Sequence, residues 1–146
     1  MPGKAPLFLA SSRGDAEECA RLIREGGLVE RAEANPEACL DGWTPLIVAA
    51  RKGYDAVVRV LLDHGASIDL ANTSGRTSLY IACLMDHAVV VRVLLDHGAS
   101  IDQANNNGAT PLYIACQNEY KAVVRVLLDH RASLEMLGPL STYSPA

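Results

Sequence analysis

Three histidines recur at one constant interval along the sequence, and each directly follows an aspartate. They are His64, His97 and His130. Imidazole and carboxylate groups are common zinc ligands, so the pattern suggests a metal site. Packed helices, however, lie ~8–10 Å apart, whereas a histidine–zinc bond is ~2.0–2.1 Å long. One histidine per helix therefore leaves neighbours too far apart to share an ion. We predict no metal site and expect these side chains to stabilise the last carbonyl groups of helices.

The four cysteines suggest a disulfide or a catalytic thiolate as a second chemistry. They are too few for a disulfide scaffold, and no CxxC pair occurs. Cys83 and Cys116 are separated by the same interval as the histidines, and Ala50 precedes Cys83 by that interval again. We therefore expect both cysteines to be small buried core residues. Cys19 and Cys39 have no assigned place, and nothing in the sequence assembles the histidine and activating field that a catalytic cysteine needs. We expect reduced thiols in an intracellular protein.

Other catalytic signatures do not occur in the sequence. It contains no glycine-rich phosphate loop, HExxH, GxSxG or paired-carboxylate constellation. We therefore predict a protein that is not an enzyme and needs no cofactor. The formal net charge is −4, from 13 basic and 17 acidic residues. The absence of a basic domain argues against binding to a nucleic-acid backbone.

The apolar segments are short. The segment AVVVRVLL from Ala88 is broken by Arg92 and falls short of the ~20 residues that cross a bilayer, so we predict no membrane partner. The first residues, MPGKAPLFLASSRGDAEE, contain only a brief apolar core, PLFLA, which is too short for the h-region of a signal peptide. We expect a cytoplasmic protein, and the sequence leaves a nuclear location open.

An internal repeat must position all these residues. The 13 residues VVRVLLDHGASID from Val57 recur unchanged from Val90 and in altered form, VVRVLLDHRASLE, from Val123. Glycine and threonine recur with the same period, as Gly42, Gly75 and Gly108 and as Thr44, Thr77 and Thr110. A repeated unit of about 33 residues predicts a solenoid in which each unit contacts only its neighbours.

Each unit predicts two helices. In the first unit, Thr44 is a good N-cap and Pro45 suits the first helical position. Gly53 can adopt the positive φ that ends this helix. A second helix is expected from about Asp55 to His64, with an apolar stripe at helical spacing. Only 5% of the residues are aromatic, so the stacked core must be aliphatic.

These units resemble the ankyrin repeat family. The family element T-P-L-H-x-A appears as TPLIVA from Thr44 and as TPLYIA from Thr110, within motifs that cover roughly residues 41–137. The resemblance implies an all-α solenoid of stacked helix-turn-helix units with projecting β-turns. We expect one domain over residues 1–146. Its parts are a degenerate N-terminal cap repeat at 6–32, repeats at 41–73, 74–106 and 107–137, and a tail at 138–146.

Departures from the family pattern concentrate in the later repeats. Asp86 and Glu119 replace the glycine that ends the inner helix, and Arg131 replaces the glycine that ends the outer helix. A left-handed residue other than glycine costs ~1–2 kcal/mol, so the last repeat should be the least stable. The last repeat also keeps the apolar residues of an internal one, without a polar cap after it. Three explanations stay open: the tail folds across this end, another molecule binds there, or the chain is a fragment of a longer array.

The resemblance implies a protein-interaction module whose concave groove is formed by turn tips and inner helices. The residues expected to contact a partner there are Arg13, Leu40, Asp41, Trp43, Arg51, Lys52, Thr73, Arg76, Leu84, Met85, Asn106, Gln117 and Asn118. Tyr54, His87 and Tyr120 should border or support the groove. Trp and Arg are over-represented among interface hot spots, so Trp43 and the basic side chains are the leading candidates.

The basic residues of this set lie toward its N-terminal half, next to apolar Leu84 and Met85. We therefore expect a protein or peptide partner with an acidic segment near an apolar anchor. The alternative is a structural or self-associating scaffold, either designed or part of a larger ankyrin array, that associates with its own kind through the uncapped C-terminal repeat.

Overall fold

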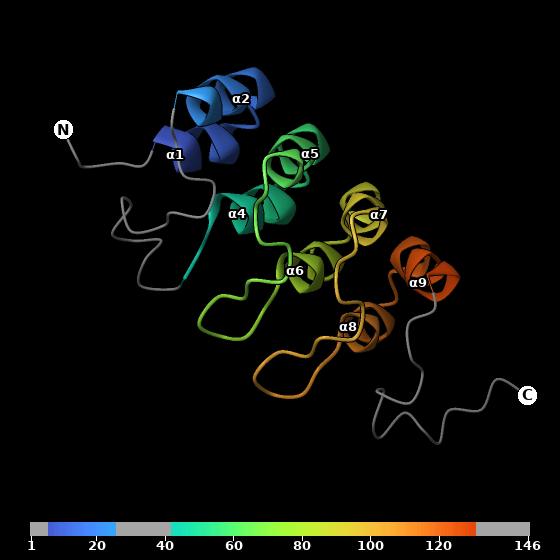
Figure 1. Cartoon of the computed structure of the whole chain (residues 1–146). Helices are drawn as coiled ribbons and strands as arrows, with labels where there is room; N and C mark the ends of the chain where they lie inside the picture. The colour runs from blue at the N-terminus through green and yellow to red at the C-terminus, as the bar shows by residue number, and fades with distance from the viewer. Residues whose placement is uncertain (1–5, 26–41, 131–146) are drawn as a thin grey trace, which may run out of the picture.

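The computed structural model describes residues 6–25 and 42–130, which form eight α-helices and no β-strand (Figure 1). The helices are α1 (Pro6–Arg13), α2 (Ala16–Arg24), α4 (Pro45–Lys52), α5 (Asp55–Asp63), α6 (Ser78–Leu84), α7 (Ala88–Asp96), α8 (Pro111–Gln117) and α9 (Lys121–Asp129). The prediction of an all-α solenoid is confirmed. No helix in the described ranges combines the length and apolar character that crossing a bilayer requires.

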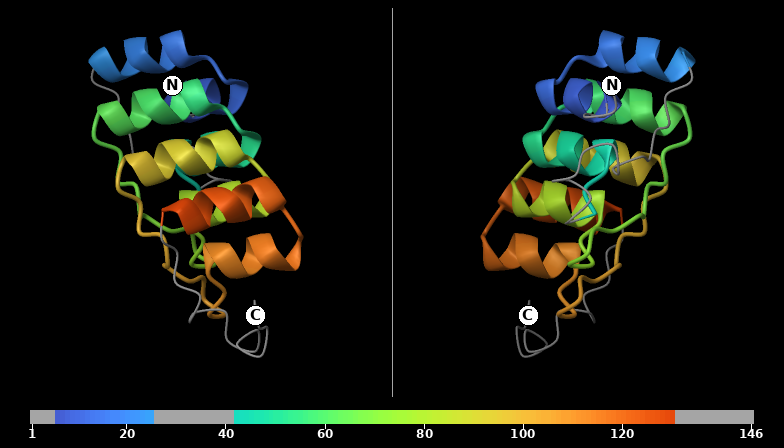
Figure 2. Two further views of the ribbon diagram at one scale, coloured as in Figure 1. Left: turned by 90° about the vertical axis from the view of Figure 1, so that its right-hand side faces the viewer. Right: turned by 90° about the vertical axis from the view of Figure 1, so that its left-hand side faces the viewer.

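The helices form two layers of four. The inner layer is α1, α4, α6 and α8, and the outer layer is α2, α5, α7 and α9. Each inner helix packs against its own outer helix and against the inner helices of adjacent pairs, and the outer helices pack in the same succession. Figure 2 shows the pairs stacked like rungs, with the long connections after α5 and α7 on one side. Equivalent residues of successive repeats therefore form rows along the stack.

A threonine begins each inner helix from α4 onward. The Oγ1 atoms of Thr44, Thr77 and Thr110 accept hydrogen bonds from the backbone N–H three residues later, each at 3.1 Å. These bonds satisfy one of the N–H groups that a helix start leaves without an intrahelical partner. Proline follows the threonine in α4 and α8, whereas Ser78 follows it in α6. The Ser78 hydroxyl is buried without a hydrogen-bond partner among the described residues.

The inner helices end in a residue with positive φ, as the sequence predicts. Gly53 has φ 81°, and the same place is taken by Asp86 with φ 64° and Glu119 with φ 61°. Neither acidic residue can adopt this conformation as easily as glycine. The expected strain is therefore present in the second and third repeats. Arg131, the other expected source of strain, lies outside the described residues.

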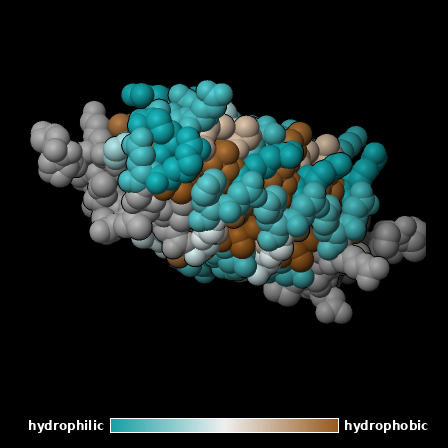
Figure 3. Space-filling model, turned by 45° about the horizontal axis from the view of Figure 1, so that its top comes forward, coloured by the Kyte–Doolittle hydropathy of each residue, from teal (hydrophilic) through white to brown (hydrophobic). Residues whose placement is uncertain are grey.

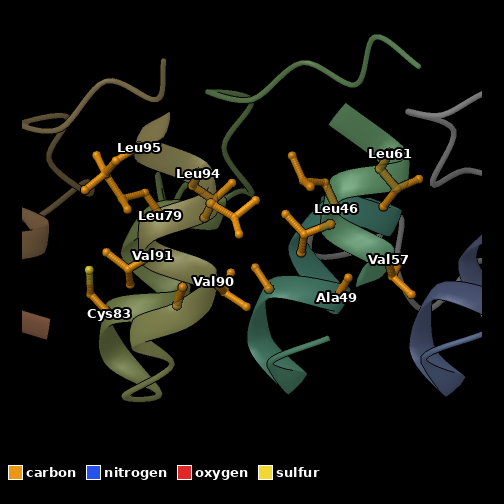
Figure 4. Packing of buried hydrophobic residues seen from close by; sticks show 14 of the residues in the cluster. Leu46, Ala49, Val57, Leu61, Leu79, Cys83, Val90, Val91, Leu94 and Leu95 are labelled. Carbon is orange, nitrogen blue, oxygen red and sulfur yellow. The ribbon is translucent and has the colours of Figure 1, made fainter. Parts of the chain in front are cut away.

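Aliphatic side chains fill the space between successive helix pairs. Figure 4 shows α4 and α5 beside α6 and α7, with labelled side chains such as Leu46 and Val90 between the two pairs and others, such as Cys83, directed toward the next pair along the stack. Leu46, Leu61, Leu79 and Leu94 are almost wholly buried in the stack. Small residues such as Ala49 let neighbouring inner helices approach closely. The stack thus depends on contacts between repeats, because neither helix of a pair has an apolar partner of sufficient size within its own repeat.

Two projecting turns have the same hydrogen bonds. In one, the Asn72 side-chain oxygen accepts from the N–H groups of Ser74 and Arg76, each at 3.0 Å. In the other, the Asn105 oxygen accepts from the N–H groups of Asn107 and Ala109, each at 2.9 Å. The asparagine side chain thus holds the turn that precedes the next inner helix.

Candidate protein-binding surface

The expected contact residues form two rows along the inner layer. One row is the C-terminal ends of the inner helices and the other is the projecting turns. Leu40 and Asp41 lie outside the described residues. The described members are Arg13, Trp43, Arg51, Lys52, Thr73, Arg76, Leu84, Met85, Asn106, Gln117 and Asn118, which we call the inner surface. Because adjacent inner helices pack together, the helix-end row is continuous from α1 to α8.

Trp43 connects the two rows in the first full repeat. Its indole lies under the guanidinium of Arg51, with the Arg51 Cζ atom 5.4 Å from the ring centroid. Trp43 precedes α4 and Arg51 is near the end of the same helix, so the stack runs along the face of α4. A cation over an aromatic face is attracted by the ring quadrupole. The stack holds a planar set of N–H donors beside a half-buried aromatic ring.

The backbone beneath this stack is held by the next repeat. The Nε2 atom of His87 donates to the Arg51 carbonyl oxygen at 2.9 Å. The same imidazole packs against Gly53, so closely that a Cβ there would lie 2.7 Å from its Nδ1 atom. Tyr54 packs in the same way against Gly14, one repeat earlier. Tyr54 and His87 occupy equivalent places in successive repeats, and each packs against the end of the preceding inner helix. Of the two roles expected for these residues, to border the groove or to support it, this packing corresponds to support.

Lys52 is already engaged within the protein. Its Nζ atom donates to the Ser12 carbonyl oxygen at 3.0 Å and lies 2.8 Å from the Ser12 hydroxyl oxygen. The ammonium group therefore joins α4 to α1. Fewer of its N–H donors therefore remain for other groups, while its charge still contributes to the basic end of the inner surface.

Arg76 has a second arginine–aromatic contact. Its Cζ atom lies 5.6 Å from the centroid of Tyr80, and its Nε atom is buried without a hydrogen-bond partner among the described residues. The Tyr80 hydroxyl accepts from the Asn105 side-chain amide at 3.2 Å, so the following turn fixes the ring. Burial raises the pKa of Tyr80, which keeps this hydroxyl protonated.

Toward the C-terminus the inner surface changes character. Met85 is 40% exposed and Leu84 is half-buried. Gln117 and Asn118 are exposed at the equivalent places one repeat later, and the Asn118 amide donates to the Ile114 carbonyl oxygen at 3.0 Å. The row thus passes from basic through apolar to neutral polar side chains.

Asn106 connects adjacent turns. Its side-chain amide donates to the Thr73 carbonyl oxygen at 2.9 Å, and its backbone N–H donates to the Ser74 carbonyl oxygen at 3.0 Å. The segment 105–107 therefore serves turn geometry and turn-to-turn packing. These contacts reduce the number of donors that Asn106 can offer to a partner.

The cysteines of the described residues are packing residues. Cys19 and Cys83 are fully buried, and burial raises the pKa of both thiols. Cys116 is half-buried, so the expectation of a buried residue is only partly correct there. It faces the end of the stack, where no described helix covers it. Cys39 lies outside the described residues.

The histidines follow the structural expectation and add a feature that sequence reasoning missed. The Nδ1 atoms of His64, His97 and His130 bond the carbonyl oxygen four residues earlier at 2.8–2.9 Å. In addition, the Nε2 atoms of His97 and His130 lie 3.5 and 3.1 Å from the preceding repeat's aspartate, Asp63 or Asp96. The recurrence of an Asp-His dipeptide every 33 residues is the feature of the sequence that could have predicted these contacts between repeats. No group of three or more metal-ligating side chains occurs within residues 6–25 and 42–130.

Comparison with known proteins identifies short regions of similarity. The chain is 38% identical over 69 residues to the glycerophosphocholine phosphodiesterase GDE1 of Eremothecium gossypii, covering 47% of this chain and 5% of that protein. It is 40% identical over 63 residues to the human transient receptor potential cation channel subfamily A member 1, covering 43% of this chain and 5% of the channel. It is 40% identical over 73 residues to the mouse ankyrin repeat and MYND domain-containing protein 1, covering 50% and 8%. The chain thus spans less than a tenth of the length of these curated relatives.

A family model described as ankyrin repeats (3 copies) matches residues 2–72 and 68–136. Repeats of this family generally mediate protein–protein interactions and are typically non-catalytic. The phosphodiesterase similarity involves only a small share of a larger protein. The family model matches almost the whole chain, and equivalent helices of successive repeats pack against one another. This protein therefore belongs to the ankyrin-repeat family.

Proposed function

We propose that this chain is a non-catalytic interaction module that binds a protein or peptide carrying an acidic segment beside an apolar anchor. The observation that carries the proposal is the stack of Arg51 on Trp43, with exposed Met85 farther along the inner surface. Arg13, Arg51 and Arg76 have no carboxylate partner among the described residues, so the inner surface offers unpaired guanidinium groups.

In this proposal each group has a distinct role. Arg51 and Arg76 bind carboxylates, because a guanidinium can donate two parallel hydrogen bonds to one carboxylate group. Trp43, Leu84 and Met85 bury the apolar anchor. Arg13 and Lys52 attract the acidic segment by long-range charge, which raises the association rate more than the affinity. The protein is expected to work in the cytoplasm, a location that its free thiols Cys19, Cys83 and Cys116 favour.

The test uses an array of synthetic peptides that combine acidic runs with a Leu or Phe, together with a matched array in which Lys replaces the acidic residues. Binding is followed through the fluorescence of Trp43, the single tryptophan of the chain. We expect acidic peptides to bind, with affinity that falls as salt rises. Arg51→Glu should weaken binding about 30-fold or more, because it removes a hot-spot contact and adds like-charge repulsion.

Arg92→Glu provides the matched control. Arg92 is an exposed residue of the outer helix α7, and its substitution by glutamate changes the net charge of the protein by the same amount as Arg51→Glu. We expect it to leave peptide affinity nearly unchanged. Equal effects of Arg51→Glu and Arg92→Glu would contradict a specific site on the inner surface. Binding of the lysine array instead of the acidic one would contradict the proposed partner chemistry.

A second candidate function is self-association through the C-terminal repeat, as a structural scaffold. It is favoured by the exposure of apolar side chains on α8 and α9. Leu128 is 43% exposed, whereas Leu95 at the equivalent place in α7 is 9% exposed. Self-association would leave the inner surface of each copy accessible to a partner.

A further inference from the structure

The projecting turn before α8 contains three consecutive asparagines, Asn105, Asn106 and Asn107, followed by Gly108. Two of the three amide side chains are held by neighbours. The Asn105 amide donates to a tyrosine hydroxyl of α6 at 3.2 Å, and the Asn106 amide donates to a carbonyl oxygen of the preceding turn at 2.9 Å. Asn107 is exposed, and its side-chain amide has no hydrogen bond among the described residues. The third amide is thus the one that can turn toward its own backbone.

Asn107 is also distinguished by the residue after it. It is the one asparagine of the whole sequence that precedes glycine. An asparagine side chain can be attacked by the backbone nitrogen of the next residue, which makes asparagine one of the less durable residues of proteins. Gly108 has no Cβ to hinder this approach, and its φ of 84° is a conformation open mainly to glycine. The reacting groups are therefore present within two adjacent residues.

The three projecting turns differ in how closely they are covered. A Cβ atom at Gly42 would lie 3.2 Å from the Cα atom of Asn72, and one at Gly75 would lie 2.7 Å from the backbone nitrogen of Asn106. At Gly108 no described atom lies within 4 Å of the same place. Each of the first two turns packs against the next one, whereas no described turn lies over the third. The backbone of the third turn can therefore move without disturbing a packed described neighbour.

The outer layer offers no comparable site. Figure 3, in which this layer faces the viewer, shows hydrophilic side chains over its helices. The hydrophilic residues of α2, α5, α7 and α9 are acidic or basic, and none of these four helices contains an asparagine. The reactive amide therefore lies on the side of the molecule from which the turns project (Figure 1).

We propose that Asn107 is a site of spontaneous deamidation, a modification that needs no enzyme and only water as co-reactant. The Gly108 nitrogen loses its proton to solvent base and attacks the Cγ atom of Asn107. The bond from this nitrogen to Cγ forms, the bond from Cγ to Nδ2 breaks, and the amide nitrogen takes up a proton and leaves as ammonia. Water then opens the resulting succinimide ring at one of its two carbonyl carbons and gives aspartate or isoaspartate. No atom is oxidised or reduced.

One hydrogen bond of the turn opposes this reaction. The Gly108 N–H donates to the Asn105 carbonyl oxygen at 3.0 Å, so this bond must open before the nitrogen reaches Cγ. The folded protein should therefore react more slowly than the unfolded chain. A single turn at the surface opens far more readily than the packed repeats. Asn107 should still react faster than the other asparagines, because the residues that follow those all carry a side chain.

The two products differ in their effect on the turn. Aspartate at this position would repeat the Asp41-Gly42 pair of the first repeat, so the turn should keep its shape. Isoaspartate places one additional carbon in the backbone and would move Ala109 away from Asn105, with which it exchanges two hydrogen bonds of 2.9 Å each. The isoaspartate form should therefore loosen the third repeat. Either product adds one negative charge, and neither depends on partner binding at the inner surface.

The experiment incubates the full-length protein at neutral and at mildly alkaline pH and follows each asparagine by mass spectrometry of its peptide. Fragment ions locate the mass gain of deamidation, and enzymatic methylation of isoaspartyl groups detects the second product. We expect deamidation at Asn107 to be at least about tenfold faster than at Asn105, Asn106 or Asn118, because glycine leaves the approach to Cγ open. Its rate should rise with pH, because hydroxide removes the Gly108 proton. The same protein in urea gives the rate without the fold.

Two variants separate the contribution of the sequence from that of the structure. Asn107→Ser reproduces the Ser74-Gly75 pair of the second repeat, so it should keep the turn and abolish the mass gain at this place. Thr73→Gly puts a glycine after Asn72, whose side-chain oxygen is held by two backbone N–H groups at 3.0 Å each. We expect Asn72 in this variant to react at least about fivefold more slowly than Asn107, because its side chain is fixed by the backbone. Circular dichroism checks that both variants keep their helices.

Thermal unfolding measures the consequence for the third repeat. Asn107→Asp should unfold at nearly the wild-type midpoint, and the fraction that contains isoaspartate should unfold at a lower one. Deamidation at Asn107 that is seen in urea but not in the folded protein would overturn the proposal, because the turn would then protect the amide. Equal rates at Asn107 and at the other asparagines would overturn it as well. Equal rates at Asn107 and at Asn72 of the Thr73→Gly protein would contradict the role given to the free amide.

Discussion

The second and third full repeats have the same residues in their helix cores, at 79–83 and 112–116 and at 90–97 and 123–130, and differ in what lies next to them. The pair α6 and α7 is covered on both sides, by α4 and α5 and by α8 and α9. The pair α8 and α9 has a described neighbour only on the α6–α7 side. Leu95 and Leu128 are the same residue in the same helical position, with exposed fractions of 9% and 43%. Burial in this protein is thus decided by neighbouring repeats more than by the sequence of a repeat itself.

The largest expected effect compares these two leucines. Leu95→Ala should lower the free energy of unfolding by about 2–4 kcal/mol, because it leaves a cavity between packed repeats. Leu128→Ala should lower it by less than about 1 kcal/mol, because the side chain is largely exposed. Urea unfolding followed by circular dichroism, at a protein concentration too low for association, measures both. Similar losses would contradict the assignment of the end of the stack to α8 and α9.

The next prediction concerns the residue that ends each inner helix. Gly53→Ala should destabilise the first full repeat by about 2 kcal/mol or more, because alanine resists positive φ and its Cβ would clash with His87. Glu119→Gly should stabilise the third repeat by about 1 kcal/mol for the converse reason. Thermal unfolding of both variants measures the difference. A destabilised Glu119→Gly protein would indicate that the glutamate side chain has a contact that outweighs the strain.

A smaller gain is expected from making α6 resemble α8. Ser78→Pro should raise the free energy of unfolding by about 0.5–1 kcal/mol, since proline limits the unfolded chain and suits the first helical position. It also removes a buried hydroxyl without a partner among the described residues. Thr77 before it has φ −80° and ψ 170°, a conformation that tolerates a following proline. Pro111→Ser, the reverse change in α8, should lower the unfolding midpoint.

The smallest effect compares the aspartate–histidine contacts at different pH. A hydrogen bond to the Val126 carbonyl, followed by the Asp96 carboxylate, raises the pKa of His130 above its usual 6.5. Its contribution to stability is therefore fully present below about pH 6.5 and is lost as pH rises through the folded-state pKa. Because the pair is exposed, the change should be at most about 0.5 kcal/mol.

Unfolding midpoints of the wild type and of His130→Gln, measured on both sides of neutral pH, check this prediction. Asp96→Asn is the control, because it keeps the side-chain volume and removes the charge nearest to the Nε2 atom. The stabilising difference between wild type and either variant should shrink as pH rises. A difference that grows with pH would mean that another group controls the titration.

Much of the fold follows from the sequence because its signals are local and repeated. Thr44, Thr77 and Thr110 begin helices as expected, and Asp86 and Glu119 take the positive φ that their alignment with Gly53 requires. The aspartate–histidine contacts between repeats were missed because they depend on the angle between successive outer helices, which one repeat does not specify. The exposure of Cys116 was misjudged because its alignment with Cys83 carries no information about the next neighbour.

The candidate surface was less predictable than the fold. The sequence placed Trp43, Arg51 and Lys52 near one another, but side-chain partners decide what each can do. Arg51 lies over Trp43, whereas Lys52 reaches across to Ser12 of α1. Both are cations at the end of the same helix. The difference arises because consecutive residues of a helix point about 100° apart, so that Lys52 faces α1 and Arg51 faces Trp43.

The identity of the segments 57–69 and 90–102 has a consequence for how the chain assembles. Because residues 57–63 and 90–96 are identical, α5 of one molecule placed at the position of α7 in another can make the contacts that residues 90–96 make there. Exchange of segments between chains during refolding is therefore opposed mainly by the linkers and by the few residues that differ, such as Asp55 and Ala88. Refolding at high concentration should yield interlocked species, which substitutions that make the two segments unlike would suppress.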